Sequence, residues 1–484
     1  MNTKTIGIVV GIIVLALAAA ILLLQGPATA PPTTTPTTTT QPKTTTPTQT
    51  QQTTTTTAPP AATPTTTTTT TSTQTQQTTT TTAAACSWKL VGMYIASEDK
   101  VVLGAPQPVQ PPPGVKTPVI VNTTATQASQ VVDIGVLQPL SGRLGSLGEL
   151  ARAAAELAAE DVNRYLTSIN APFRVRVLAD DTQADPAVAL DKLKSLHAKS
   201  VRYFVVRTSG EVRQMKPYAN ENKLILISVS STAPGLVTST DYVFRLPPDD
   251  TKQAKALAAV LKSQGVKAVV IIHRNDDWGR GLANQLRSLL EGQMEVTVAA
   301  AYDPQKGEFS AEVSTLADKV SAAVSKYGAD KVAVVAPGFA ELQSIFLTAA
   351  NYPVLSQVKW YGTDGSTGLK ELTDPKVCQF ATKVGGFVST KFAPARSPYY
   401  QRVREYLLSK FGREPDAYAY NAYDAVWLIA YTILENGGDA DTAKFFAKFP
   451  EVAANYFGAS GLTRLNQNHD RDTADYELWA LVGS

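Results

Sequence analysis

The chain has 484 residues, of which 44% are hydrophobic and 18% charged, so it is long enough for more than one globular domain. Its 44 Lys and Arg residues against 41 Asp and Glu give a net charge of only +3, which argues against a nucleic-acid-binding protein. Two cysteines, Cys86 and Cys378, and three histidines, His197, His273 and His469, are too scattered for a zinc motif or a metal cluster. We therefore expect no metal and no cofactor.

The N-terminal segment Ile6–Leu24 is uncharged and almost wholly apolar. A helix of this length spans roughly 28 Å, about the thickness of a bilayer core. Lys4 precedes it and no charge follows until Lys43, so the positive-inside rule places the rest of the chain outside the cell. The small residues at Ala28–Ala30 also fit a signal-peptidase site, so two interpretations stay open. The length of the apolar run and the following Pro31 favour an uncleaved membrane anchor over a cleaved signal peptide.

After this segment (residues 1–30), residues 31–85 are nearly all Thr, Pro and Gln, a composition that predicts a disordered and O-glycosylated stalk. Residues 86–130 form an extension to which the sequence assigns no role, with an N-glycosylation sequon at Asn122–Thr124. In an oxidising exterior the two cysteines either pair with each other or remain free thiols, and both alternatives stay open.

From Val131 onward, short β-rich runs alternate with segments of helical apolar spacing. The expected strands are 88–95, 131–137, 173–178, 201–206, 224–228, 267–273, 295–301 and 331–335. The expected helices are 150–162, 186–197, 210–220, 251–263, 279–291, 309–327 and 341–351. Repeated βα units imply parallel sheets, and roughly 350 residues exceed one comfortable sheet. We predict an α/β protein of two lobes: residues 131–250 with 383–459, and residues 251–382 with 460–484.

Open α/β sheets bind ligands at the carboxyl ends of their strands, and several motifs follow those ends. They are Ile134–Gly142 (IGVLQPLSG), Asp180–Pro186, Pro217–Thr232, Phe244–Asp250 and Asn421–Ala425. In this order and spacing they resemble the branched-chain amino-acid and amide-binding family of periplasmic solute-binding proteins of ABC transporters, over about residues 133–482. The resemblance implies the type I periplasmic binding protein fold: two Rossmann-like lobes joined by crossover strands, with a cleft that closes on its ligand.

On the first lobe, the resemblance implies that Ser209 and the turn Ser230, Ser231 and Thr232 hold the carboxylate of a ligand. The chemistry of the residues agrees, because Ser209 stands at the start of a predicted helix, where a hydroxyl and free N–H groups can receive an anion. The alternative is that these hydroxyl groups only cap helices.

On the second lobe, the resemblance implies that Asp364 is the partner of a ligand amine, although an aspartate before a glycine also marks a turn. Trp278 is the expected aromatic lid, where the family usually has a tyrosine, and Phe339 is a second lid position. Leu147 stands where the family has an aromatic residue on the first lobe. These departures leave the ligand unidentified, and each aromatic residue is also compatible with ordinary packing.

The sequence thus predicts a membrane-anchored extracellular protein that captures a small polar ligand, an amino acid or a related amide or organic acid. Hinge closure of two lobes would deliver the ligand to the permease subunits of an ABC importer. No P-loop, GxGxxG after a strand, HExxH or GxSxG is present, so we expect a protein that is not an enzyme. The alternatives are a ligand-sensing or an adhesive cell-surface protein, and an adhesive protein predicts no ligand cleft.

Overall fold

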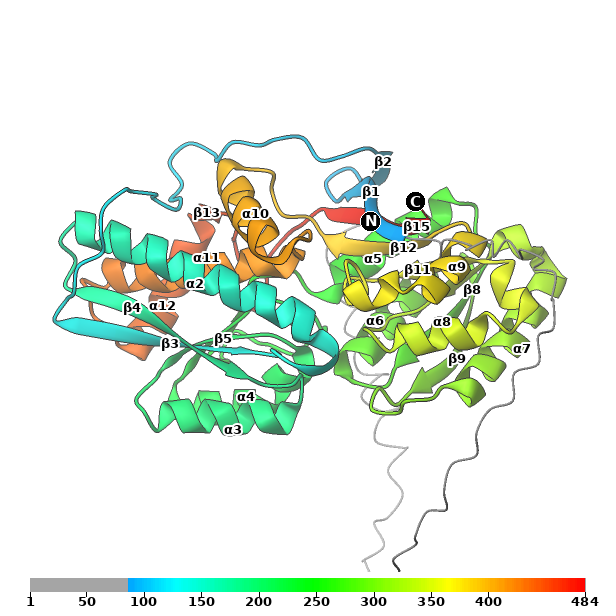
Figure 1. Ribbon diagram of the computed structural model, residues 1–484, viewed down its shortest axis with the longest axis horizontal. Helices are drawn as coiled ribbons and strands as arrows, with labels where there is room; N and C mark the ends of the chain where they lie inside the picture. The colour runs from blue at the N-terminus through cyan, green and yellow to red at the C-terminus, as the bar shows by residue number, and fades with distance from the viewer. Residues whose placement is uncertain (1–85, 484) are drawn as a thin grey trace, which may run out of the picture. The chain divides into compact units, whose positions relative to one another are not determined.

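The computed structural model describes residues 86–483, which fold into two α/β lobes (Figure 1). Lobe 1 is built on a five-stranded parallel sheet in the order β4-β3-β5-β6-β7. Its strands are β3 (Gln130–Gln138), β4 (Phe173–Asp181), β5 (Tyr203–Val206), β6 (Ile225–Ser228) and β7 (Val243–Arg245). Strands β5 and β6 are buried along their whole length, which explains why they read as unbroken apolar runs in the sequence.

Helices cover both faces of the lobe 1 sheet. One face is covered by α3 (Pro186–His197) and α4 (Ser209–Asn222). The other packs against α2 (Gly145–Ser168), α10 (Pro398–Phe411), α11 (Ala417–Glu435) and α12 (Thr442–Ala454). The side chain of Asp185 caps α3 by accepting from two backbone N–H groups, and Pro186 occupies the first turn.

Lobe 2 is built on an eight-stranded mixed sheet in the order β2-β1-β15-β12-β11-β10-β8-β9. Its parallel strands are β8 (Ala268–Arg274), β9 (Glu295–Tyr302), β10 (Val332–Val335), β11 (Lys359–Gly362) and β12 (Phe387–Phe392). The strand β15 (Tyr476–Gly483) is antiparallel to β12. One face packs against α5 (Asp250–Ser263) and α6 (Asp277–Leu290), and the other against α7 (Ser310–Tyr327), α8 (Leu342–Ala349) and α9 (Pro375–Lys383).

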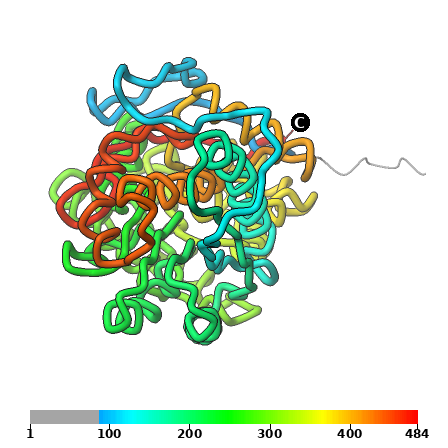
Figure 2. The backbone as a smooth tube through the Cα atoms, turned by 90° about the vertical axis from the view of Figure 1, so that its left-hand side faces the viewer, coloured from blue at the N-terminus to red at the C-terminus, as the bar shows by residue number. Residues whose placement is uncertain are grey.

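The extension before β3 is part of the folded body. The strands β1 (Cys86–Ile95) and β2 (Lys100–Leu103) complete the lobe 2 sheet, with β1 antiparallel to β15. A disulfide joins Cys86 to Cys378 of α9, so the paired alternative is the one the structure shows. The chain then crosses to lobe 1, where the backbone N–H of Lys116 donates to Asn455 O at 2.6 Å. Figure 2 shows this blue-to-cyan segment passing over the lobes.

Three further connections join the lobes. The first follows β7 and leads into α5, as expected from the sequence. The second follows β12, which pairs within the lobe 2 sheet, so this boundary lies about ten residues later than the predicted 382/383 division. The third leads into β15; residues just before it remain with lobe 1, where Arg245 pairs with Asp470 in a parallel bridge. The sequence missed these two boundaries because the lobe to which β12 and the segment before β15 belong depends on pairing with strands that are distant in the chain.

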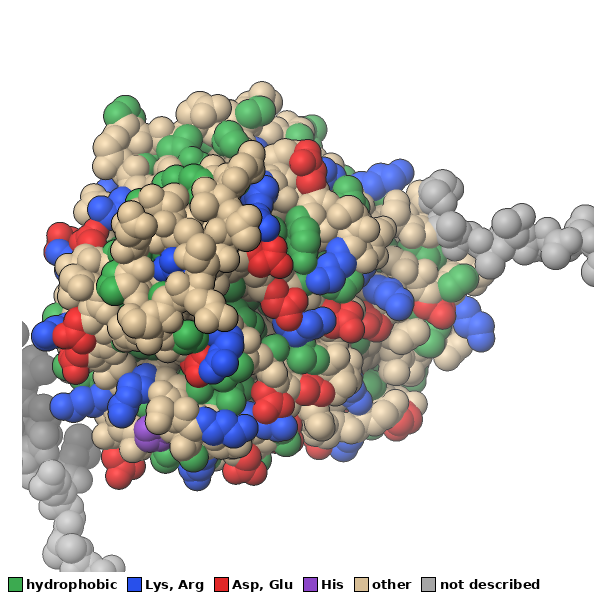
Figure 3. Space-filling model, turned by 60° about the vertical axis from the view of Figure 1, so that its left-hand side comes forward, with side chains coloured by type: hydrophobic (Ala, Val, Ile, Leu, Met, Phe, Trp, Pro, Cys, Tyr) green, Lys and Arg blue, Asp and Glu red, His purple; other side chains and the backbone are tan. Residues whose placement is uncertain are grey.

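Charges are mixed over the surface. On the face drawn in Figure 3, acidic and basic side chains lie interspersed. Among the residues described, no helix is long and apolar enough to cross a bilayer. The predicted anchor and stalk fall in residues 1–85, outside the part of the chain that the structure describes.

Candidate ligand-binding site

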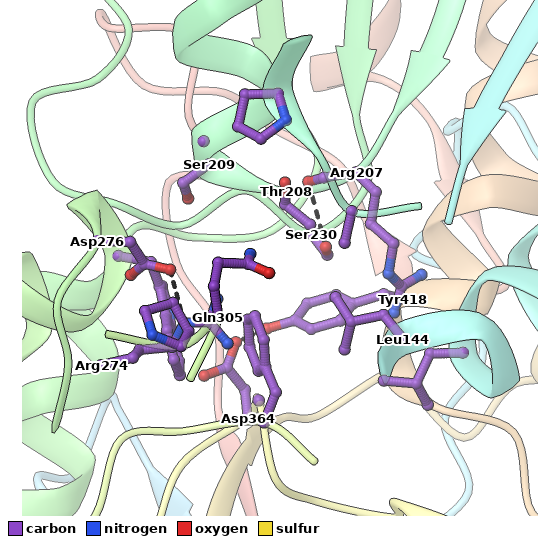
Figure 4. A pocket seen from close by; sticks show the side chains of 18 residues that line it. Leu144, Arg207, Thr208, Ser209, Ser230, Arg274, Asp276, Gln305, Asp364 and Tyr418 are labelled. Atoms are coloured by element: carbon purple, nitrogen blue, oxygen red, sulfur yellow. Dashed lines mark hydrogen bonds and ion pairs between the residues drawn. The ribbon is translucent and has the colours of Figure 1, made fainter. Parts of the chain in front are cut away.

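A cavity of about 190 Å³ lies between the lobes, at the carboxyl ends of both parallel sheets (Figure 4). On lobe 1 it is lined by the loops that follow β3, β4, β5 and β6, and on lobe 2 by the loops that follow β8, β9, β10 and β11. One further lining residue, Tyr418, comes from α11. The cavity therefore lies where open α/β sheets place their ligands.

The cavity brings together most of the predicted site residues. Those that line it are Leu147, Ser209, Ser230, Trp278, Phe339 and Asp364. Ser231 and Thr232 do not line it; both are buried behind Ser209. The hydroxyl of Thr232 instead donates to Asp250 at 2.9 Å, at the first crossover, which turns it away from the cavity. Ser231 and Thr232 therefore lie one layer behind the residues that line the cavity, and their contact with a ligand stays a prediction.

The hydroxyl of Ser209 has all its acceptor capacity occupied. It accepts from Ser231 Oγ at 3.1 Å and from the backbone N–H groups of Thr232 and Ala233 at 3.3 and 3.2 Å. A hydroxyl oxygen has two lone pairs and one proton, so these three donors share the two lone pairs, and what Ser209 has left to offer is its proton. This geometry favours a hydrogen-bond acceptor, such as a carboxylate oxygen, as the ligand group opposite Ser209.

The start of α4 fixes that hydroxyl in place. The helix is capped by Thr208, whose Oγ1 accepts from the N–H of Glu211 at 3.3 Å, while the Glu211 carboxylate accepts from the N–H of Thr208 at 2.7 Å. This reciprocal pair is a capping box. Ser209 is therefore the first helical residue rather than the cap, and it adds its hydroxyl to the positive end of the helix dipole.

Lobe 2 contributes a stack of flat side chains. The rings of Trp278 and Phe339 lie 4.8 Å apart at 20°, and the guanidinium of Arg274 lies 4.0 Å from the centre of the Phe339 ring. Arg274 is held in turn by Asp276 at 2.6 Å and Glu341 at 2.8 Å. The stack gives the lobe 2 side of the cavity an apolar surface that is held by contacts within that lobe.

Asp364 is a buried carboxyl group with one free oxygen. It is 5% exposed; its Oδ2 accepts from the hydroxyl of Tyr418 at 2.5 Å, and its Oδ1 has no partner among the described residues. Burial raises the pKa of Asp364 above its ordinary value. Burial and the charge of Asp364 together raise the pKa of Asp250 well above the ordinary value of an aspartate. The free oxygen of Asp364 is suited to accept from a ligand N–H group.

The two lobes touch on either side of the cavity. Arg143, in the loop after β3, donates to the backbone oxygen of Pro304 and to that of Lys306 at 3.1 Å. On the other side, Arg213 of α4 pairs with Asp277 of α6 at 2.5 Å. With the Tyr418–Asp364 hydrogen bond between them, these contacts bring the walls of the cavity together in a closed arrangement.

The family model described as the receptor family ligand binding region matches residues 150–484. The chain belongs to this family. It is 32% identical to an uncharacterized protein of Methanocaldococcus jannaschii, over 74% of this chain and 90% of that protein. It is 26% identical to a Leu/Ile/Val-binding protein of Rhizobium johnstonii, over 72% of this chain and 91% of that protein. One of these two relatives is thus named as a branched-chain amino-acid-binding protein, in line with the resemblance found in the sequence.

The fold of this receptor-family chain matches that of solved binding proteins. A leucine-binding protein of Thermotoga maritima superposes with a TM-score of 0.61 at 21% identity, over 73% of this chain and 99% of that protein. The sheet order and the crossovers described above are thus those of the type I periplasmic binding proteins. The Rhizobium johnstonii and Thermotoga maritima proteins are both named as binding proteins.

Several residues that line this cavity were not predicted from the sequence. Arg207 and Thr208 directly follow β5, so the rule that ligands lie after strand ends would have found them. Arg207 is 2% exposed and donates to Asp416 at 2.8 Å, while its Nη1 has no partner among the described residues. Tyr418 carries no local signal, because it lies inside a buried helix whose sequence resembles ordinary core.

Proposed function

We propose that this chain is a solute-binding protein that captures a small polar molecule, an amino acid or a related amide or organic acid, for an ABC importer. The observation that carries the proposal is the pairing of a free donor with a free acceptor in one closed cavity. The Ser209 proton on lobe 1 suits a carboxylate, and the unpartnered Oδ1 of Asp364 suits an ammonium or amide N–H. An α-amino acid carries both groups on one carbon.

The size of the cavity supports a small ligand. About 190 Å³ is below the roughly 300–1,000 Å³ that is typical of pockets for drug-sized ligands. The stacked rings of Trp278 and Phe339 offer an apolar surface for a short side chain. The relative from Rhizobium johnstonii, named as a Leu/Ile/Val-binding protein, fits this chemistry.

Hinge closure is the mechanism that we propose. The hydroxyl groups of Ser209 and Thr208 are held by contacts within lobe 1, so ligand first binds there. Lobe 2 then closes with Trp278 and Asp364, and the contacts of Arg143 and Arg213 form across the mouth. The closed arrangement would present a surface, made from both lobes, to permease subunits.

The proposed location is the outer face of the cell membrane, with the N-terminal segment as anchor. The disulfide between Cys86 and Cys378 supports this, because such bonds persist in oxidising surroundings. The exposed position of Asn122, in the segment that crosses to lobe 1, is compatible with a sugar at the predicted sequon.

The test is a thermal-shift screen of the purified chain, with its disulfide intact, against amino acids, amides, short peptides and organic acids. A ligand of the folded state present at 100 times its dissociation constant stabilises the protein by about 2.7 kcal/mol, a visible shift. A hit among amino acids supports the proposal, and loss of uptake after deletion of the chain would separate transport from sensing. Absence of any hit, with uptake unchanged on deletion, would favour an adhesive role.

A further inference from the structure

A second cavity, of about 450 Å³, lies beside the strands that cross between the lobes. Its lining comes from lobe 2 through the start of β1, the loop after β11, and strands β12 and β15. Lobe 1 contributes α10, α11 and the loop between them. The buried ion pair of Arg207 and Asp416 belongs to the wall between the cavities, since Arg207 lines the first and Asp416 the second.

A buried lysine without a counter-ion lines this hinge cavity. Lys391 of β12 is 4% exposed, and its Nζ donates to Thr367 O at 3.2 Å. It forms no ion pair within 4.0 Å with any residue that the structure describes. Burial lowers the pKa of Lys391, while the more distant charges of Asp416 and Asp364 oppose that shift. A buried ammonium of this kind is costly unless an anion comes to it.

None of the carboxylates that line the hinge cavity acts as the counter-ion of Lys391, because each already pairs with an arginine. The pairs are Glu414 with Arg404, Asp416 with Arg207, and Glu477 with Arg396. The unmatched groups are donors: the hydroxyl of Tyr420 and Nη1 of Arg413 have no partner among the described residues. The cavity therefore holds an excess of unsatisfied N–H and O–H groups.

Four flat aromatic side chains also line the hinge cavity. Trp88 comes from β1, Trp479 from β15, and Tyr400 and Phe411 from α10. Unsatisfied donors beside aromatic faces suit an anion carried on an apolar body. We propose that the hinge cavity is a second ligand site, which binds a small monocarboxylate with a flat apolar body and pairs its charge with Lys391.

A ligand bound at this site would change the affinity of the first cavity for its own ligand. Both lobes line it, so a ligand that fits one hinge angle better than another shifts the equilibrium between open and closed forms. An anion next to Lys391 also adds negative charge on the side of Asp364, which favours a cationic group there. The coupling is reciprocal, so each ligand would tighten the binding of the other.

The experiment titrates the full chain with phenylacetate, and with phenylacetamide as its neutral counterpart, by isothermal calorimetry. We expect saturable binding of one phenylacetate. The affinity falls at least about tenfold for the amide and for Lys391→Met. It stays unchanged in Lys370→Met, which removes an exposed lysine at the same cavity. It also stays unchanged in Ser209→Ala, which weakens the first cavity alone.

Two outcomes overturn the proposal. One is no saturable binding by the unaltered chain at millimolar phenylacetate. The other is binding that survives in Lys391→Met and is lost in Ser209→Ala, which would place the acid in the first cavity and leave the proposed function standing. Lys391→Met removes an unpaired buried charge, so we expect its melting temperature to be equal or higher. Tyr420→Phe, which deletes only an unpartnered hydroxyl, gives an independent variant with several-fold weaker binding.

Discussion

The two walls of the ligand cavity are built in different ways. The lobe 1 wall consists of small hydroxyl side chains fixed by backbone groups: Ser209 by the turn after β6 and Thr208 by the capping box of α4. The lobe 2 wall consists of large side chains held by one another, with Trp278 on Phe339, and Phe339 on Arg274. One wall is set by secondary structure and the other by side-chain packing.

This difference assigns the walls different parts in binding. The groups of lobe 1 keep their geometry when the lobes separate, because all their contacts lie within that lobe. The carboxyl group of Asp364 on lobe 2 depends on closure, since its hydrogen-bond partner Tyr418 belongs to lobe 1. Lobe 1 therefore offers a preorganised site, and lobe 2 adds affinity on closing.

The largest expected effect comes from Asp364. Asp364→Asn keeps an acceptor for Tyr418 but removes the buried charge opposite a ligand ammonium. Removing one partner of a buried charge pair costs about 2–5 kcal/mol, so amine-bearing ligands should bind at least about 30-fold more weakly. Calorimetric titration with an amine-bearing ligand and with its amine-free analogue measures the loss. Asp330→Asn, on an exposed lobe 2 aspartate, is the matched control. If both ligands lost affinity equally, Asp364 would not be the partner of a ligand amine.

Ser209→Ala tests the preorganised wall. The variant loses the donor to the ligand and leaves the N–H groups of Thr232 and Ala233 without their acceptor, at a cost of about 1–3 kcal/mol. We expect a loss of affinity for every ligand that carries a carboxylate, whether or not it carries an amine. Ser230 lines the same cavity, but Ser230→Ala removes only the hydrogen bond that Ser230 donates to Arg207 O. Its loss of affinity should therefore be smaller. The reverse order of the two variants would show that Ser209 does not hold the carboxylate.

Acid pH should distinguish the contributions of the two walls to ligand affinity. Burial raises the pKa of Asp364, so this carboxyl takes up its proton at a higher pH than an ordinary aspartate does. As pH falls through that raised pKa, the ammonium loses its counter-charge, and affinity for amines should drop by about tenfold per pH unit. The hydroxyl groups of lobe 1 do not titrate, so amine-free acids should keep their affinity over the same range. Asp364→Asn should abolish this difference in pH dependence between amines and amine-free acids. If the variant kept the difference, another group, such as Asp250, would be the one that takes up the proton.

The sequence predicted the strands of lobe 1 more completely than those of lobe 2. Strands such as β5 and β6 are short apolar runs that could be read locally, whereas the ligand-binding roles of Ser209 and Ser230 rested on the family resemblance. The prediction of Trp278, Phe339 and Asp364 rested on resemblance, and the structure places all three at the cavity. Nothing local indicated that Trp278 stacks on Phe339, because that contact depends on how two loops pack.

The extension shows a second limit of prediction from the sequence. The run of residues 88–95 was predicted to be a strand, and it is one. Its partner β15 lies almost 400 residues away, so its membership of the lobe 2 sheet had no local signal. The disulfide of Cys86 also had no local signal, because the pairing of distant cysteines depends on the distance between them in the folded protein.

The smallest expected effect comes from the contact of the lobes at the cavity mouth. Arg213 pairs with Asp277, but its side chain is 54% exposed, and exposed ion pairs contribute about 0–1 kcal/mol. Arg213→Ala should therefore weaken binding less than about fivefold while raising the rate of ligand release, since closure loses one contact that forms only in the closed arrangement. Stopped-flow release measures this, with Arg287→Ala as the control, because Arg287 is an exposed residue of α6 that forms no ion pair with any residue the structure describes. An affinity loss as large as that of Ser209→Ala would mean that closure, rather than the preorganised wall of lobe 1, dominates the binding energy.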